Sequence, residues 1–154
     1  MTITVSEESV CAALKDFDKL LKTFETSQKK KELESKVRAR SREVLTNVWT
    51  GGLCPTLTFY LAKAEEENIA IVKETVEERK SLDGEPEKLG YAIILYLTFR
   101  RLKVLKFIEQ DLSKPRECLQ ALITMEPFRR TYATNLLTSY LLEFKKLCEA
   151  VFKE

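Results

Sequence analysis

The sequence of 154 residues contains no histidine. This absence excludes Ser-His-Asp triads, Cys-His dyads and the imidazole general base of most hydrolases. It also excludes nearly every histidine-containing metal site, including the Glu-x-x-His pattern of di-iron helical bundles. The acidic runs offer no substitute, because adjacent carboxylates of a helix point in different directions and do not converge on one ion. We therefore expect no enzyme activity, no metal and no cofactor.

Glycine and proline are also scarce, with four of each. No segment alternates apolar and polar residues for long enough to predict a strand, and most of the glycines and prolines fall between stretches of helical periodicity. The chain is therefore predicted to be all-α, a single-domain bundle of about five to six helices over residues 1–154. The expected helices cover about residues 6–26, 31–49, 54–80, 87–111, 115–124 and 127–152.

Long hydrophobic runs and paired cysteines are missing as well. No stretch of about 18 uninterrupted apolar residues exists, and Met1 to Val10 lacks the basic and then apolar pattern of a secretion signal. The four cysteines lie far apart without a C-x-x-C pair and beside apolar stripes. We interpret them as reduced and structural, with a disulfide as the open alternative. A soluble, cytoplasmic protein is expected.

Two local patterns define predicted helix boundaries. In the first helix, with Ser6 as the expected N-cap, helical spacing places six apolar residues on one face: Val10, Ala13, Leu14, Phe17, Leu21 and Phe24. After the second helix, Gly51-Gly52 is predicted to provide the left-handed end and Pro55 the first turn of the next helix. This junction lacks the G-x-x-x-x-G-K-[ST] spacing of a phosphate-binding loop, so a backbone role is the stronger interpretation.

Charge is the most distinctive feature that is present. Between Lys29 and Arg42, seven basic residues stand against two acidic ones, a local charge of +5, whereas the segment from Tyr60 to Glu87 has nine acids and four bases, or −5. A basic run either binds nucleic-acid phosphates or forms an ordinary solvated helix face. The candidate phosphate contacts are Lys31, Lys36, Arg38, Arg40, Arg42, Arg129, Arg130, Lys145 and Lys146.

The order of these segments carries a family resemblance. An acidic amphipathic first helix precedes a basic second helix, then the break Thr50-Gly51-Gly52-Leu53 and the run Leu57-Thr58-Phe59-Tyr60-Leu61. The last helix has the pattern Leu-Leu-x-x-Tyr-Leu-x-x-Phe-Lys-Lys-x-x-Glu-Ala, formed by Leu136, Leu137, Tyr140, Leu141, Phe144, Lys145, Lys146, Glu149 and Ala150. Together these features resemble the small helical subunit of Cmr-type (type III-B) CRISPR effector complexes.

The resemblance implies a non-catalytic subunit that stacks in copies beside larger Cmr-type subunits, lining the groove where guide RNA pairs with target RNA. Base pairing would supply sequence specificity, so this subunit would hold backbone phosphates, with Arg38, Arg42, Lys145 and Lys146 as the favoured contacts. Neither a membrane nor a small-molecule substrate is expected. The main alternative is a helical adaptor whose basic helix binds an acidic protein partner, without an RNA role. An enzyme that relies on carboxylates or a lone thiol is a third.

Overall fold

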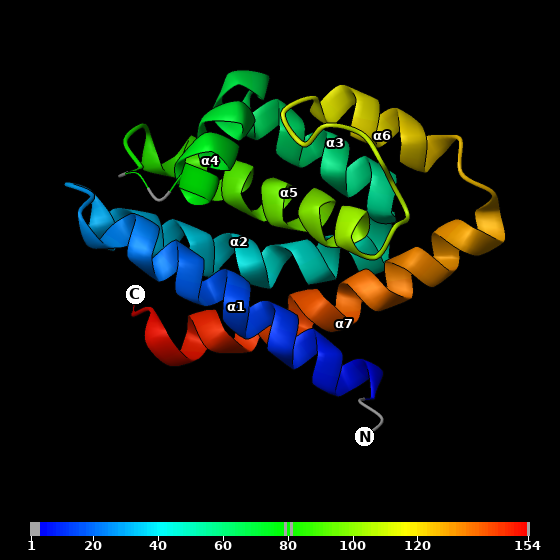
Figure 1. Ribbon diagram of the computed structural model, residues 1–154, viewed down its shortest axis with the longest axis horizontal. Coiled ribbons are helices and arrows are strands. Elements are labelled where there is room, and N and C mark those ends of the chain that lie inside the picture. Colours follow the sequence, from blue (N-terminus) through cyan, green and yellow to red (C-terminus); the bar gives the residue numbers. More distant parts are fainter. Residues whose placement is uncertain (1–3, 79, 81, 154) are drawn as a thin grey trace.

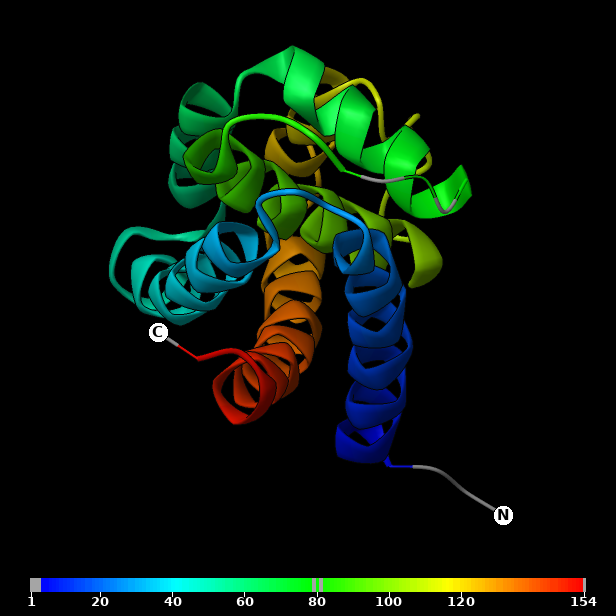
Figure 2. The same ribbon diagram turned by 90° about the vertical axis from the view of Figure 1, so that its left-hand side faces the viewer.

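The structure is a computed structural model that describes residues 4–78, 80 and 82–153. The described residues form seven helices and no strand, so the all-α prediction is confirmed, with slightly more helices than expected. The helices are α1 (Val5–Glu25), α2 (Lys30–Gly51), α3 (Leu53–Ala64), α4 (Glu66–Glu78), α5 (Pro86–Val104), α6 (Pro115–Ile123) and α7 (Pro127–Val151). Figure 2 shows α7 between α2 and α1, with the other helices stacked on this layer.

Helix α5 is the central element of the bundle. It packs against α2, α3, α4 and α7, and Figure 1 shows it crossing the middle of the molecule. Every residue from Leu89 to Phe99 is buried, as expected for a helix that is apolar on most sides. Gly90 allows α2 to approach closely, because a Cβ atom at this position would lie only 3.0 Å from the Cβ of Lys36.

The predicted helix 54–80 is wrong as a single helix. Helix α3 ends at Ala64, and Glu65 adopts a positive φ of 68° before α4 begins. The side-chain amide of Asn68 donates to the Ala64 carbonyl at 2.8 Å, which satisfies an acceptor that the break releases. The chain then turns so that α4 packs against α5. Residue 79 of the predicted range lies outside the described residues.

The predicted helix 87–111 is too long. Helix α5 ends at Val104, and Lys106 has a φ of 66° while the Phe107 N–H donates to the Leu102 carbonyl at 2.9 Å. This left-handed turn stops the helix, and the chain continues without regular helix to α6. Because lysine rather than glycine occupies the turn, the sequence contains no ordinary stop signal there.

The first helix begins earlier and is rotated relative to the prediction. Thr4, not Ser6, is the N-cap: its hydroxyl accepts from the Glu7 N–H, and the Glu7 carboxylate accepts from the Thr4 N–H. Val10 and Leu14 were expected inside but are 38% and 42% exposed. The inward face is instead formed by buried residues that include an acid: Ser9, Ala13, Asp16, Phe17, Leu20, Thr23 and Phe24.

The remaining boundaries largely follow their sequence signals. Helices α6 and α7 begin at Pro115 and Pro127, as predicted. At the α2–α3 junction only Gly52, with a φ of 90°, needs the freedom of glycine, because Gly51 remains helical with nothing near its missing Cβ. Among the described residues, no helix is both long and apolar enough to cross a membrane.

Candidate nucleic-acid interface

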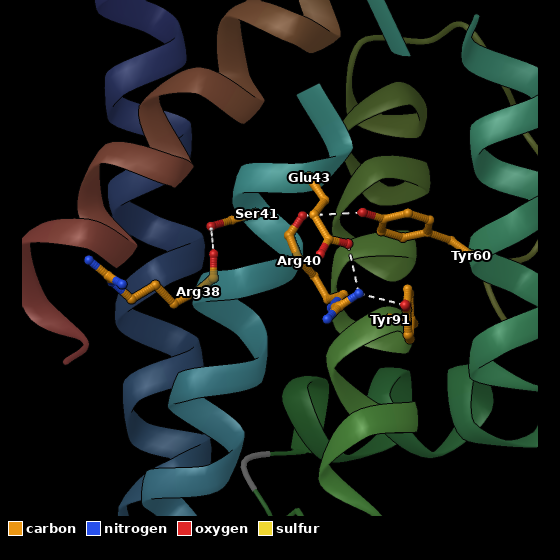
Figure 3. Close-up of polar contacts among 6 residues, drawn as sticks. All are labelled: Arg38, Arg40, Ser41, Glu43, Tyr60 and Tyr91. Carbon is orange, nitrogen blue, oxygen red and sulfur yellow. Dashed lines mark hydrogen bonds and ion pairs between the residues drawn. The ribbon is translucent and has the colours of Figure 1, made fainter. Parts of the chain in front are cut away.

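The basic residues of α2 project from two opposite sides of the helix. Arg38 and Arg40 are two positions apart, which is about 200° around a helix. Figure 3 shows Arg38 pointing away from α5 and toward α7, whereas Arg40 points toward α5. The basic run that is continuous in sequence is therefore divided between two surfaces.

On the α5 side, Arg40 is held in a polar and aromatic cluster (Figure 3). Its Nη1 atom donates to the Glu43 carboxylate at 2.7 Å and to the Tyr91 hydroxyl at 2.5 Å, and its guanidinium lies 4.5 Å from the Tyr91 ring centroid. The Tyr60 hydroxyl donates to the Arg40 carbonyl at 3.3 Å. Burial, with a smaller effect of Glu43, raises the pKa of Tyr60 well above its usual value. The Arg40 side chain is only 14% exposed and joins α2 to α5, while its backbone carbonyl joins α2 to α3.

Lys36 lies one turn before Arg40 and belongs to the same side of α2. Its backbone and Cβ form the close contact with Gly90 of α5, and the residue is half-buried. Lys31, in the first turn of α2, is exposed. The seven-residue spacing from Lys31 to Arg38 places these two residues on the same side of the helix.

On the other side of α2, basic residues from two helices meet at one carboxylate. Arg42 Nε lies 3.1 Å from Glu149 Oε1, and Lys145 Nζ lies 3.9 Å from the same oxygen. One turn away, Lys146 pairs with Glu143 at 3.1 Å. We call this surface the α2–α7 face, and it consists of Arg38, Arg42, Lys145, Lys146 and Glu149. It brings together the four basic residues favoured as RNA contacts.

Arg129 and Arg130 do not join this surface. They begin α7, about 24 Å along the helix from Lys145 at 1.5 Å per residue. Arg129 Nη2 donates to the Lys106 carbonyl at 2.9 Å, and its guanidinium lies 5.2 Å from the Phe107 ring centroid. Arg130 donates to two carbonyls at the end of α6, at 3.1 and 3.4 Å. Both arginines bind backbone acceptors that helix and turn geometry leave open.

A buried ionic cluster between α1, α5 and α7 was missed by the sequence analysis. Asp16 is 4% exposed, accepts from the Tyr140 hydroxyl at 2.6 Å and pairs with Arg100 Nη1 at 2.5 Å. The neighbouring Arg101 pairs with Glu8 at 3.3 Å and lies 5.5 Å from the Tyr140 ring centroid. Burial, followed by the Asp16 charge, raises the pKa of Tyr140 well above its usual value.

The sequence did contain a signal for this cluster. Asp16 lies three residues after Ala13 and four before Leu20, which places a lone acid within the buried face of α1. A carboxylate in this position needs a cation or hydrogen-bond donors from another element. The Arg100-Arg101 pair on a mostly apolar helix was the matching signal.

The cysteines differ from one another in their surroundings. Cys118 and Cys148 are buried and Cys54 is half-buried, whereas Cys11 is exposed, so the structural role expected for thiols beside apolar stripes does not extend to Cys11. All four are free thiols. Burial raises the pKa of Cys118 to about 11 and that of Cys148 to about 12, so both stay protonated at neutral pH and are poor nucleophiles. Within the described part of the chain, no cluster of His, Cys, Asp or Glu is arranged to hold a metal ion.

Comparison with solved structures identifies the fold. A chain of the type III-B Cmr-beta complex bound to cognate target RNA and AMPPnP, determined by cryo-EM, matches with a TM-score of 0.79 and 20% identity, over 96% of this chain and 97% of that chain. This chain shares that fold. A chain of the Cmr-beta complex bound to non-cognate target RNA matches with a TM-score of 0.76 and 20% identity, over 99% of both chains. No protein-family model and no curated protein matches the sequence.

The extent of the Cmr-beta match matters as much as its score. Isolated helical hairpins recur in many unrelated folds, because helix packing uses a small set of angles. A match over 96% to 99% of the chain instead includes the order and packing of nearly all the described helices. The resemblance seen in the sequence is thus confirmed at the level of the fold.

Proposed function

We propose that this chain is a non-catalytic small subunit of a cytoplasmic type III-B (Cmr) CRISPR ribonucleoprotein complex. Copies of it stack beside the larger subunits along the groove in which guide RNA pairs with target RNA, and they contribute to RNA-targeting antiviral defence. The observation that carries this proposal is the shared fold, over nearly the full chain, with a chain of an RNA-bound Cmr-beta complex. The sequence resemblance, which rests on helix order and short motifs, supports the same assignment.

Within this role, the α2–α7 face contacts the RNA backbone. Base pairing between guide and target supplies the sequence specificity, so the subunit needs cations that contact phosphates rather than side chains that read bases. Arg42 and Lys145 suit this role because Glu149 holds both near one point, at 3.1 and 3.9 Å. A phosphate that approaches this point takes the place of the exposed Glu149 carboxylate in these two ion pairs. This carboxylate is a weak competitor, since exposed ion pairs contribute only about 0–1 kcal/mol.

The other candidate residues have stronger structural roles. Arg40 and Lys36 face α5. Arg129 and Arg130 donate to backbone carbonyls of the chain that precedes α7, at Lys106 and at the end of α6. These four residues contact α5 or donate to backbone carbonyls, whereas the pairs of Arg42, Lys145 and Lys146 are made with carboxylates at the surface. The proposed RNA contact is therefore narrower than the set of nine basic residues, and it centres on the α2–α7 face with Lys31 at its edge.

Purification of the tagged chain from its native cells tests the assignment to a complex. We expect it to copurify with the large subunit of a type III complex, with the repeat-binding backbone subunits and with guide-length RNA. Mass spectrometry and RNA sequencing identify these components. Recovery of the chain without the large subunit and without RNA would contradict the proposal.

Neutralising the α2–α7 face tests the RNA contact within the assembled complex. Arg42→Gln combined with Lys145→Gln should lower target-RNA affinity about tenfold at low salt, with a smaller loss at high salt. The matched control is Lys114→Gln with Lys153→Gln, which removes two exposed positive charges elsewhere. If the complex assembles and both pairs of substitutions behave alike, the face binds no RNA, and a protein partner becomes the better assignment.

A further inference from the structure

A groove follows the line where α1 faces α4 and α5. It consists of two adjoining cavities of about 530 and 250 Å³, which share Lys19, Lys22 and Arg100 in their walls. Figure 2 places α1 and α2 on opposite sides of α7, so this groove is separate from the α2–α7 face. We call it the α1–α5 groove.

Lysines line this groove at regular helical spacing. Lys15, Lys19 and Lys22 of α1 recur at i, i+4 and i+7, which places them on one side of the helix. Among the described residues, none of their ammonium groups has an ion-pair partner. Three positive charges thus lie along about 10 Å of helix, at 1.5 Å per residue.

The carboxylates in the walls of the groove offset this charge only in part. Three of the four already have partners: Asp16 with Arg100 and Tyr140, Glu8 with Arg101, and Glu77 with Lys73. Only Asp18 lacks an ion pair within the described part of the chain. Counting the groups without ion pairs, three lysines against one aspartate leave a local excess of two positive charges.

A buried hydroxyl in the groove has no hydrogen-bond partner among the residues that the structure describes. This hydroxyl belongs to Tyr96, which lines the smaller cavity with Lys22 and Arg100 and is 1% exposed. Nearly all buried polar groups in native proteins are hydrogen-bonded, so this hydroxyl has a donor position open to an acceptor oxygen, and that position lies beside the cations Lys22 and Arg100. Arg100 adds to this, because Asp16 engages only Nη1 of its three guanidinium nitrogens, which together carry five N–H donors, and its side chain is 28% exposed.

The arrangement of donors favours an extended anion with repeated charges. A single small ion would satisfy one cation, whereas the groove has three lysines in a row with arginine and tyrosine donors beside them. The acidic α4 of a second copy, with the preceding Glu65, fits poorly because these carboxylates are largely paired within the chain: Glu65 with Lys88, Glu66 with Arg116, Glu77 with Lys73, and Glu74 and Glu78 with Lys80.

We infer that the α1–α5 groove is a second site that binds the phosphate backbone of a single-stranded nucleic acid. Lys15, Lys19 and Lys22 contact successive phosphates, and Arg100 and Tyr96 donate to phosphate oxygens at the narrow end. Side chains of these types commonly supply backbone contacts to nucleic acids. The inference rests on the groove itself and does not require membership of a Cmr complex.

Fluorescence anisotropy with the full chain and a labelled oligouridylate of 20 nucleotides tests the site. Lys19→Gln with Lys22→Gln should lower the affinity about tenfold at low salt and reduce the slope of log K against log salt by about 1.4, or about 0.7 for each lost contact. Lys114→Gln with Lys153→Gln is the matched control for net charge. A loss no greater than that of the control pair overturns the proposal.

Two further comparisons separate the possible outcomes. If Arg42→Gln with Lys145→Gln abolishes binding while the groove pair has no effect, the groove proposal fails and the proposed function stands. DNA of the same length should bind within a fewfold of the RNA, because the contacts are to phosphates. A poly-glutamate peptide that binds more tightly than the oligonucleotide assigns the groove to an acidic protein and overturns the proposal.

Tyr96→Phe tests the role of the hydroxyl independently of the lysines. The variant should match or exceed the original chain in stability to urea, because a buried group without a partner is removed. Its affinity for the oligouridylate should nevertheless fall about two- to threefold with the lost donor. A loss of stability with unchanged affinity would show that the hydroxyl has a structural partner and would remove it from the site.

Discussion

The α2–α7 face and the α1–α5 groove use positive charge in different ways. On the α2–α7 face, Arg42 and Lys145 share Glu149, and all three side chains are about a third or more exposed. In the groove, the main ion pair is buried around Asp16, and the lysines above it have no ion-pair partners among the described residues. A charge count along the sequence thus measures how many cations a segment contributes. It does not measure how many the fold leaves unneutralised.

The largest expected difference between the two regions is in stability. Asp16→Ala should lower the free energy of unfolding by about 3–5 kcal/mol, because it leaves Arg100 and the buried Tyr140 hydroxyl without their partner. Glu149→Ala should cost at most about 1 kcal/mol, since its ion pairs are exposed. Urea unfolding of both variants measures the difference. Equal losses of unfolding free energy would show that Asp16 stabilises the fold no more than Glu149 does.

Most of the fold follows from local signals in the sequence. Pro115 and Pro127 mark helix starts, and Gly52 supplies the backbone freedom that the α2–α3 junction needs. The two internal boundaries that were missed, at Glu65 and Lys106, have positive φ values at residues that rarely adopt them. Tertiary packing imposes these turns, so local propensity does not reveal them.

Less of the candidate site follows from the sequence. Helical periodicity already separates Arg38 and Arg42 from Lys36 and Arg40, which face the other side of α2. The meeting of Arg42 with Lys145 depends on how α2 packs on α7, and the sequence alone does not specify that contact. A search for dense charge runs also overlooks lysines spaced one turn apart, as in α1.

The buried tyrosine of the groove predicts a pH dependence. Burial raises the pKa of Tyr96 to about 12, from an ordinary value near 10. The unfolded chain releases this proton first, so the stability contributed by Tyr96 is complete below pH 10 and is lost between pH 10 and 12. The loss is about 1.4 kcal/mol for each pKa unit.

Tyr96→Phe should therefore flatten the alkaline limb of the stability curve. The urea midpoints of Tyr96→Phe and of the original chain, measured from pH 8 to 12, should differ by a constant amount below pH 10. Above pH 10 the midpoint of the original chain should fall more steeply. Parallel curves through pH 12 would mean that the Tyr96 hydroxyl has the same pKa in the folded and unfolded states. Tyr96 would then be more open to water than its exposed fraction of 1% indicates.

A smaller effect distinguishes the two sides of α2. Arg40→Ala should lower the free energy of unfolding by about 1–2 kcal/mol, because it removes an ion pair, a hydrogen bond to Tyr91 and a cation–π contact. Arg42→Ala should cost less than about 1 kcal/mol. For RNA binding we expect the opposite order, with a larger loss of affinity for Arg42→Ala than for Arg40→Ala. Fluorescence anisotropy measures both affinities. If Arg40→Ala weakens binding more than Arg42→Ala at equal folding, the division of α2 into packing and binding sides is wrong.

The smallest expected effect concerns the carboxylates that compete with a bound phosphate. Glu149→Gln keeps the size of the side chain but removes one negative charge from the α2–α7 face, and Asp18→Asn does the same in the α1–α5 groove. Each should raise the affinity for single-stranded RNA about two- to threefold at low salt, and the gain should disappear near 1 M salt, where screening is strong. Glu117→Gln, at an exposed site on α6, controls for the change in net charge.

A gain confined to Asp18→Asn assigns RNA binding by the free chain to the groove, whereas a gain confined to Glu149→Gln assigns it to the α2–α7 face. Equal gains mean that strands bind on both sides of α7.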